Sequence, residues 1–287
     1  MNIYLCIIIG ALLLEFILFN LSRNLDLKNI STSLPNEFKG YYSASEYTRS
    51  QEYLVENTRF SYLTSAVDVL IILMVILFGL FNNVDLWIRG FGFSPMVSGL
   101  LFFGVLFLFQ DMISTPFSLY RTFIIEENYG FNKTTPKTYL LDKLKSYFLL
   151  IILGGLILSL ILFFFNRFGD LAWLYAWIFL SAFLVLIQPL FTLFIAPMFN
   201  TFTPLEDGEL KDKINTFAEK VNFPISRIDV MDGSRRSSKS NAYFSGLGKT
   251  KRIALFDTLI EKHSVDELLS IIAHEVGHYK KKHNIKG

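Results

Sequence analysis

Long apolar stretches separated by polar connections dominate the first two thirds of the chain. A helix needs about 20 mostly apolar residues to cross the ~30 Å hydrocarbon core of a bilayer. The connection at residues 166–170 is so short that the helices on either side of it are expected to form an antiparallel hairpin. The pattern predicts five transmembrane helices, at approximately residues 3–20, 62–81, 97–115, 147–165 and 171–196.

After residue 196 the pattern changes to that of a small α+β domain. Residues 226–231, which alternate with period two, and residues 252–256 are typical of strands. We expect turns at residues 232–234 and at Gly246 and Gly248, and a polar loop at 235–239. An amphipathic helix precedes the strands, because apolar residues recur with helical spacing at Leu210, Ile214, Phe217, Ala218 and Val221.

We therefore divide the chain into a transmembrane helical domain, residues 1–196, and an α+β domain, residues 197–287. The first apolar stretch is expected to be a retained helix rather than a secretory signal. It has no Lys or Arg ahead of it, it contains Glu15, and it lacks a small-residue cleavage site.

Composition supports an integral membrane protein. The mean hydropathy is +0.41 and only 18% of residues are charged, whereas soluble domains carry about 25% charged residues. The net charge of +2, with basic and acidic residues intermixed, excludes a nucleic-acid role. The single cysteine, Cys6, excludes an intrachain disulfide and a cysteine-based metal site, so any metal must be held by His and carboxylate side chains.

The basic residues predict the orientation of the helices. Lys and Arg are concentrated in cytoplasmic connections of membrane proteins. The first and third connections are therefore expected to be cytoplasmic, together with everything after Pro197, and the N-terminus is expected outside. The first connection contains Arg23, Lys28, Lys39, Arg49 and Arg59, the third contains Arg121, Lys133, Lys137, Lys143 and Lys145, and the second and fourth contain only Arg89 and Arg167.

Three carboxylates, Glu15, Asp68 and Asp111, lie within or at the ends of the apolar stretches. A carboxylate is costly there unless it reaches an interface or faces a bundle interior or water. Two interpretations stay open: pairing at the membrane interface, or a hydrated chamber enclosed by the helices.

A metal-binding helix is predicted near the end of the chain. Ser264 and Glu267 have the spacing of a capping box, which begins a helix. His274 and His278 then lie one turn apart on the same face, where both can bind one zinc ion. Glu275, beside His274, can act as the general base that takes a proton from water.

Only two metal ligands are visible in this motif, whereas catalytic zinc uses three protein ligands and water. The third could be an upstream Glu, but we expect it beyond Gly287. His283 lies about 180° around the helix from His274 and cannot reach the same ion. We expect His263 and His283 to be surface histidines or to support the ligands.

Several runs resemble the type I CAAX prenyl endopeptidases, which are integral-membrane zinc metallopeptidases. In the membrane half these are YRTFIIEE at 120–127 and GFNKTT at 130–135. In the α+β half they are GSRRSSKSNAYF at 233–244, KRIALFDTL at 251–259 and HEVGHY at 274–279, with His283.

The resemblance implies a helical barrel around a watery chamber, with a zincin-like metal domain at its cytoplasmic end. His274 and His278 would be zinc ligands and Glu275 the general base. Asn241, Ala242 and Tyr243 would bind substrate on an edge strand, to which an extended peptide adds. The substrates would be peptides or proteins, in eukaryotes those with a prenylated C-terminal cysteine motif.

The family takes its third zinc ligand, a Glu, from a helix beyond a further membrane hairpin. We therefore expect the chain to correspond to the N-terminal two thirds of such an enzyme, with the metallopeptidase domain truncated. It would then be a fragment of a longer protein, a truncated gene product that needs a partner, or an inactive remnant. The alternatives are a protease that removes misfolded membrane proteins and a non-catalytic scaffold or transporter. A bacterial inner membrane is expected, or the endoplasmic reticulum if the protein is eukaryotic.

Overall fold

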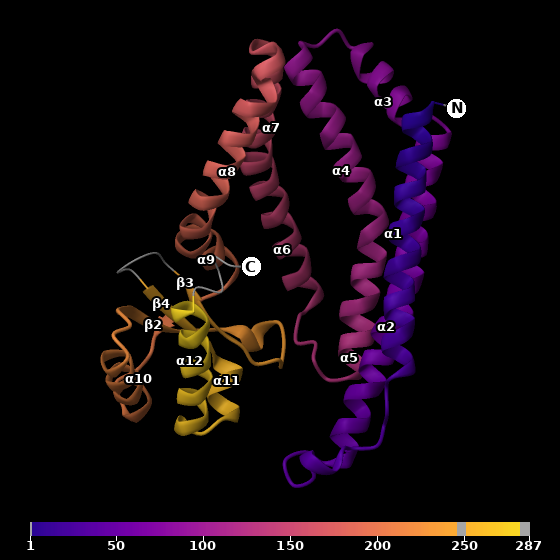
Figure 1. Cartoon of the computed structure of the whole chain (residues 1–287). Helices are drawn as coiled ribbons and strands as arrows, with labels where there is room; N and C mark the ends of the chain where they lie inside the picture. The colour runs from indigo at the N-terminus through magenta and orange to yellow at the C-terminus, as the bar shows by residue number, and fades with distance from the viewer. Residues whose placement is uncertain (1, 246–250, 282–287) are drawn as a thin grey trace. The chain divides into compact units, whose positions relative to one another are not determined.

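The computed structural model describes residues 2–245 and 251–281 (Figure 1). Its contacts divide the chain into two compact units, residues 1–129 and 130–287. The second unit contains both the later membrane helices and the α+β part, which contact each other through hydrogen bonds of Arg236. The domain boundary at residue 196 was inferred from composition rather than from contacts, and it stays a prediction.

Five helices are long and apolar enough to cross a membrane, as predicted. In the first unit they are α1 Ile3–Lys28, α2 Ala44–Leu77, and α4 Pro95–Tyr120, which continues through a π-helical turn, Arg121–Ile125, into α5 Glu126–Asn128. In the second unit α6 Pro136–Leu149 continues through a π turn, Leu150–Gly154, into α7 Gly155–Arg167. The fifth is α8 Ala172–Leu190, followed by a π turn, Phe191–Ile195, and α9 Ala196–Phe199.

The fourth and fifth membrane helices form the predicted hairpin. Helix α7 ends at Arg167, Gly169 adopts φ +50°, and α8 begins at Ala172. The two helices pack along each other, and aromatic pairs such as Phe164 with Tyr175 join them.

Helix α2 is much longer than the apolar stretch that predicted it. It begins at Ala44 rather than near residue 62, and at 1.5 Å per residue the additional part is about 27 Å long. A complete capping box of Ser43 and Glu46 begins it. Gly79, with φ +65°, ends the run near residue 78, and a short amphipathic helix that was not predicted follows, α3 Leu80–Arg89.

The carboxylates in the membrane helices occupy different surroundings. Glu15 and Asp68 are exposed on α1 and α2, whereas Asp111 on α4 is half-buried and accepts a hydrogen bond from Thr115 Oγ1 at 3.3 Å. Both interpretations of these residues stay predictions.

The α+β part contains a mixed sheet in the order β1-β2-β4-β3. β2 and β4 are parallel, and β1 and β3 are antiparallel to their neighbours. The two predicted strands and the amphipathic helix are confirmed, whereas β1 and α11 were not predicted. The elements are β1 Phe202–Pro204, α10 Glu209–Lys220, β2 Ile225–Met231, β3 Ala242–Ser245, β4 Lys251–Phe256, α11 Asp257–Lys262 and α12 Val265–Lys280.

The predicted turn at 232–234 is part of a 3-10 helix, Gly233–Arg235. A Cβ on Gly233 would lie 2.5 Å from Phe256 Cδ2, so the close approach of this turn to β4 requires glycine. The predicted turn at Gly246 and Gly248 lies outside the described residues.

The core of the α+β part lies between one face of the sheet and the helices. Ile228 and Ile253 are register partners, so their side chains share that face with Leu255. Helices α10, α11 and α12 lie together on this side (Figure 1). The buried cluster is Leu205, Ile214, Phe223, Ile228, Ile253, Leu255, Leu259, Leu268, Ile272 and Val276.

The opposite face of the sheet contains a buried carboxylate that alternation alone would leave in water. Asp229 has no exposed surface. Its Oδ1 accepts a hydrogen bond from Arg227 Nε at 2.6 Å, and its Oδ2 accepts one from Arg252 Nε. The Arg252 guanidinium also stacks 4.3 Å above the Phe202 ring. Asp229 therefore pairs with two arginines and ties β2 to β4.

We predict that Asp229→Ala lowers the free energy of unfolding of the α+β part by about 3 kcal/mol, because it leaves two arginines without their buried partner. Pulse proteolysis of the detergent-solubilised protein measures this loss. The matched control is Asp207→Ala, whose side chain is 96% exposed, and it should change the free energy by no more than about 0.5 kcal/mol. Equal stability of the two variants would contradict the assignment.

Candidate metal centre

Helix α12, which contains the histidine pair, begins with the predicted capping box. Ser264 N donates to Glu267 Oε2 at 2.8 Å, and Glu267 N donates to Ser264 Oγ at 3.4 Å. The hydrogen bond from the Ser264 backbone is the main cause of a lowered pKa of the Glu267 carboxyl. The box satisfies amide groups that the first turn would otherwise leave unpaired.

The buried face of α12 determines the rotation of this helix about its axis. Leu268, Ile272 and Val276 recur every four residues and are at most 2% exposed. His274 and His278 follow Ile272 and Val276 by two positions, which at ~100° per residue is about 200° around the helix. Both histidines are accordingly exposed on the side of α12 away from its core contacts.

The two imidazoles of the predicted metal site lie close together. Their Nε2 atoms are 3.0 Å apart, close to the ~3.3 Å separation of two nitrogens that bind one zinc tetrahedrally at 2.0–2.1 Å each. This distance is compatible with both nitrogens as ligands of one ion. Glu275 is half-buried beside them.

Among the residues that the structure describes, no group of three His, Cys, Asp or Glu side chains is close enough to hold a metal. His263 lies before α12, where its Nδ1 is 3.7 Å from Glu267 Oε2, far along the helix from the pair. His283 lies outside the described residues.

The three predicted substrate-binding residues lie at the start of the outer strand of the described sheet. Ala242 and Tyr243 are in β3, and Asn241 immediately precedes it. The Asn241 carbonyl accepts a hydrogen bond from Phe256 N at 3.0 Å, and its side chain caps Ala242 N at 2.9 Å. Burial raises the pKa of the Tyr243 hydroxyl, which faces Met231 Sδ at 3.9 Å. β3 packs against α12, so these residues and the histidines belong to neighbouring elements.

Two runs that the sequence analysis treated separately contact each other. Asn132 and Ser237 form an antiparallel bridge, and Ser238 N donates to Phe131 O at 3.0 Å. Arg236 N–H groups bind Asp142 on α6 at 2.8 and 3.0 Å. The local sequence pattern could not reveal the contact between Arg236 and Asp142, because these two residues are 94 positions apart.

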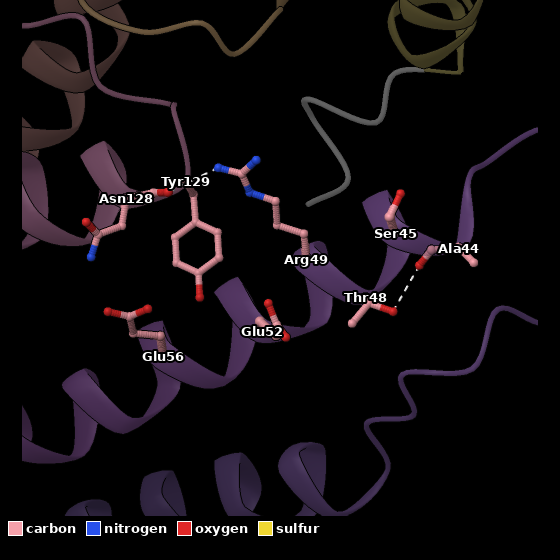
Figure 2. Close-up of a pocket in the computed structure, with 8 residues that line it drawn as sticks. All are labelled: Ala44, Ser45, Thr48, Arg49, Glu52, Glu56, Asn128 and Tyr129. Carbon is pink, nitrogen blue, oxygen red and sulfur yellow. Dashed lines mark hydrogen bonds between the residues drawn. The ribbon is translucent and has the colours of Figure 1, made fainter.

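The first unit contains an open pocket of about 720 Å³. Figure 2 shows Arg49 and Glu56 of α2 on either side of the Tyr129 ring, and Arg49 Nη2 donates to Asn128 O at 3.1 Å. Burial, followed by the hydrogen bond to Glu56, raises the pKa of Tyr129 to about 12. None of the predicted site residues lines this pocket, which is formed by Ala44, Ser45, Thr48, Arg49, Glu52, Glu56, Asn128 and Tyr129.

Comparison with known proteins matches both halves of the chain to families. Residues 25–201 match the family described as CAAX prenyl protease N-terminal, five membrane helices. Residues 204–287 match peptidase family M48, whose members are metallopeptidases that generally use zinc.

Individual relatives give the same result. CAAX prenyl protease 1 of Saccharomyces cerevisiae is 39% identical over 88% of this chain, and its Homo sapiens homolog is 30% identical over 93%. The chain spans 58% and 66% of the lengths of these two relatives. The crystal structure of S. mikatae Ste24p is 34% identical, with a TM-score of 0.92 over 100% of this chain and 69% of that one.

Five apolar helices of membrane-crossing length, the α+β fold behind them and the matches on both sides of residue 202 lead to one conclusion: this multi-pass integral membrane protein belongs to the CAAX prenyl protease family of M48 peptidases.

Proposed function

We propose that this chain supplies the membrane helices and the zinc-binding helix of an endopeptidase that cleaves C-terminal peptides from prenylated substrates. The observation that carries the proposal is the pair of Nε2 atoms 3.0 Å apart on the capped helix α12. Membership of the CAAX prenyl protease family supports the substrate class, since the relatives bear that name.

In this proposal His274 and His278 hold one zinc ion. The third protein ligand is a Glu from a downstream part of the protein, as the family resemblance implies. A zinc ion in this position supplies a Lewis acid that makes water more acidic and polarises the carbonyl of the substrate.

Glu275 is the general base. Its carboxylate takes a proton from the attacking water as oxygen bonds to the carbonyl carbon, and it delivers a proton to the amine as the C–N bond breaks. Its position directly after His274, on the same turn of α12, supports this role.

The peptide binds along β3, with Asn241, Ala242 and Tyr243 as its contacts. Support comes from the outer position of β3 in the described sheet and from its packing against α12. An extended peptide pairs with such a strand through main-chain hydrogen bonds.

The proposed orientation has the N-terminus outside and the peptidase part in the cytoplasm, in an endoplasmic-reticulum or bacterial inner membrane. The distribution of Lys and Arg supports it.

For the metal, we predict that His274→Ala and His278→Ala each abolish stoichiometric zinc binding in the full-length protein. Each substitution removes one of the three proposed protein ligands of the zinc ion. Elemental analysis of the purified protein measures the zinc content. His263→Ala is the control and should keep one zinc per protein. Zinc retained by both ligand variants would remove the metal assignment, and absence of zinc from the wild type would favour a scaffold or transporter.

For the general base, we predict that Glu275→Gln leaves the zinc content unchanged. It should lower the rate of peptide cleavage by about 10²–10⁴-fold, which is the usual contribution of a general base. Cleavage of a prenylated peptide, followed by mass spectrometry, provides the measurement. Glu261→Gln, at an exposed position of α11, is the control with normal turnover. Normal turnover of Glu275→Gln would exclude the role.

Orientation can be measured with single cysteines in a background in which Cys6 and any other cysteine of the full-length protein are replaced by Ser. In sealed vesicles whose outer surface is the non-cytoplasmic face of the membrane, Asn166→Cys at the end of α7 should react with a membrane-impermeant maleimide. Asn215→Cys, which is exposed on α10, should react only after detergent is added. The reverse pattern would overturn the proposed orientation.

A further inference from the structure

The side chain of Arg236 joins three segments of the second unit. Its Nε and Nη2 donate to the two carboxylate oxygens of Asp142 on α6, at 2.8 and 3.0 Å. Nη1 donates to Asn200 Oδ1 at 2.8 Å, and Nη2 also donates to Phe199 O at 2.6 Å, where α9 ends. The Arg236 and Asp142 side chains are only 24% and 21% exposed. Because the guanidinium donates through two N–H groups to the two oxygens of one carboxylate, the pair fixes the relative orientation of Arg236 and Asp142 as well as the distance between them.

The backbone around Arg236 is held as well. Its carbonyl accepts hydrogen bonds from Lys133 N at 3.0 Å and Thr134 Oγ1 at 3.1 Å. Ser238 Oγ donates to Gly130 O at 2.8 Å, next to the Asn132–Ser237 bridge. We call the contacts of Arg236 with Asp142, Phe199 and Asn200, together with the pairing of residues 130–134 with 236–238, the Arg236 junction.

The junction lies between the membrane helices and the edge strand. Asp142 is about five residues ahead of the apolar stretch that begins near residue 147, or ~7 Å along the helix, and Asn200 follows the fifth membrane helix directly. On the other side, Ser240 Oγ donates to Thr258 O at 3.0 Å and Thr258 Oγ1 donates to Lys239 O at 3.1 Å. β3 begins two residues after Ser240. The chain between the junction and the strand is therefore short and leaves the strand little freedom to move independently.

The Arg236 junction is separate from the apolar contacts that hold α12 against the sheet. None of its residues belongs to the buried cluster that contains Leu268, Ile272 and Val276. Loss of the Arg236 contacts would therefore leave α12 packed while releasing the start of β3 from α6 and α9.

We propose that Arg236 is a positioning residue that sets the height of β3 relative to the bilayer and so selects the peptide bond presented to the histidine pair. The inference rests on the proposed function. A substrate whose lipid lies in the membrane has one fixed end, and its peptide runs along β3. Each residue of an extended chain spans about 3.3 Å, so a shift of β3 by that distance moves the neighbouring peptide bond to the metal.

The first test compares Arg236→Ala with Arg235→Ala in the full-length protein, because Arg235 is the adjacent arginine and is exposed. The probe is a prenylated peptide, and mass spectrometry identifies the products. Arg236→Ala should keep its zinc, lose about 10²-fold in kcat/KM and cut at neighbouring bonds. Arg236→Lys, which keeps the charge but not the fork, should give an intermediate product distribution, and Arg235→Ala should match the wild type.

A second measurement requires no catalysis. Spin labels at Asn166→Cys and Asn215→Cys, in the same cysteine-free background, report the distance between the membrane hairpin and α10, which packs on β2 of the sheet within the second unit. Arg236→Ala should shift or broaden this distance on the scale of one strand residue, ~3.3 Å, whereas Arg235→Ala should not.

Unchanged products together with an unchanged spin-label distance would overturn the proposal. Loss of zinc in Arg236→Ala would also overturn it, because the arginine would then support the fold as a whole. If the wild type cuts no peptide, the proposed function fails, and the spin-label distance alone decides whether Arg236 positions the strand.

Discussion

The packing of α12 on the sheet is the interaction on which the candidate site depends. Leu268, Ile272 and Val276 are buried one turn apart, and the same helical repeat directs His274 and His278 to the opposite side. A rotation of α12 would bury the two imidazoles and expose the apolar residues. Burial of the core therefore determines the direction in which His274 and His278 face. The capping box at Ser264 fixes where this helix begins, and the edge strand β3 lies against it.

Charged contacts complete what apolar packing leaves undetermined in the second unit. Asp229 joins β2 to β4 on the face of the sheet away from the helices. Arg236 joins the segment before β3 to α6 and to the end of α9. Both are low-exposure contacts between segments distant in sequence. Apolar burial thus holds the layers together. The Asp229 pairs hold strands within the sheet, and the Arg236 pair joins the segment before β3 to the membrane helices of this unit.

Sequence alone predicted the number of membrane helices, the α+β class and the capped helix that contains the two histidines, because each follows from local periodicity or spacing. It did not predict that α2 continues through residues 44–61, because this part of the helix is polar and a hydropathy window detects only apolar stretches. The burial of Asp229 and the pairing of Arg236 with Asp142 were also missed, because such contacts depend on which segments the fold brings together. The third zinc ligand is likewise a question of tertiary structure that two histidines on one turn cannot answer.

The extension of α2 separates the pocket beside Tyr129 from the apolar part of that helix. The first turns of α2 stand outside the apolar part, by up to about 27 Å at the start of the helix. The pocket that these turns form with Asn128 and Tyr129 is lined by acidic, basic and hydroxyl side chains, among them Arg49, Glu52 and Thr48. It therefore presents hydrogen-bonding groups, rather than an apolar wall, to any molecule that enters it.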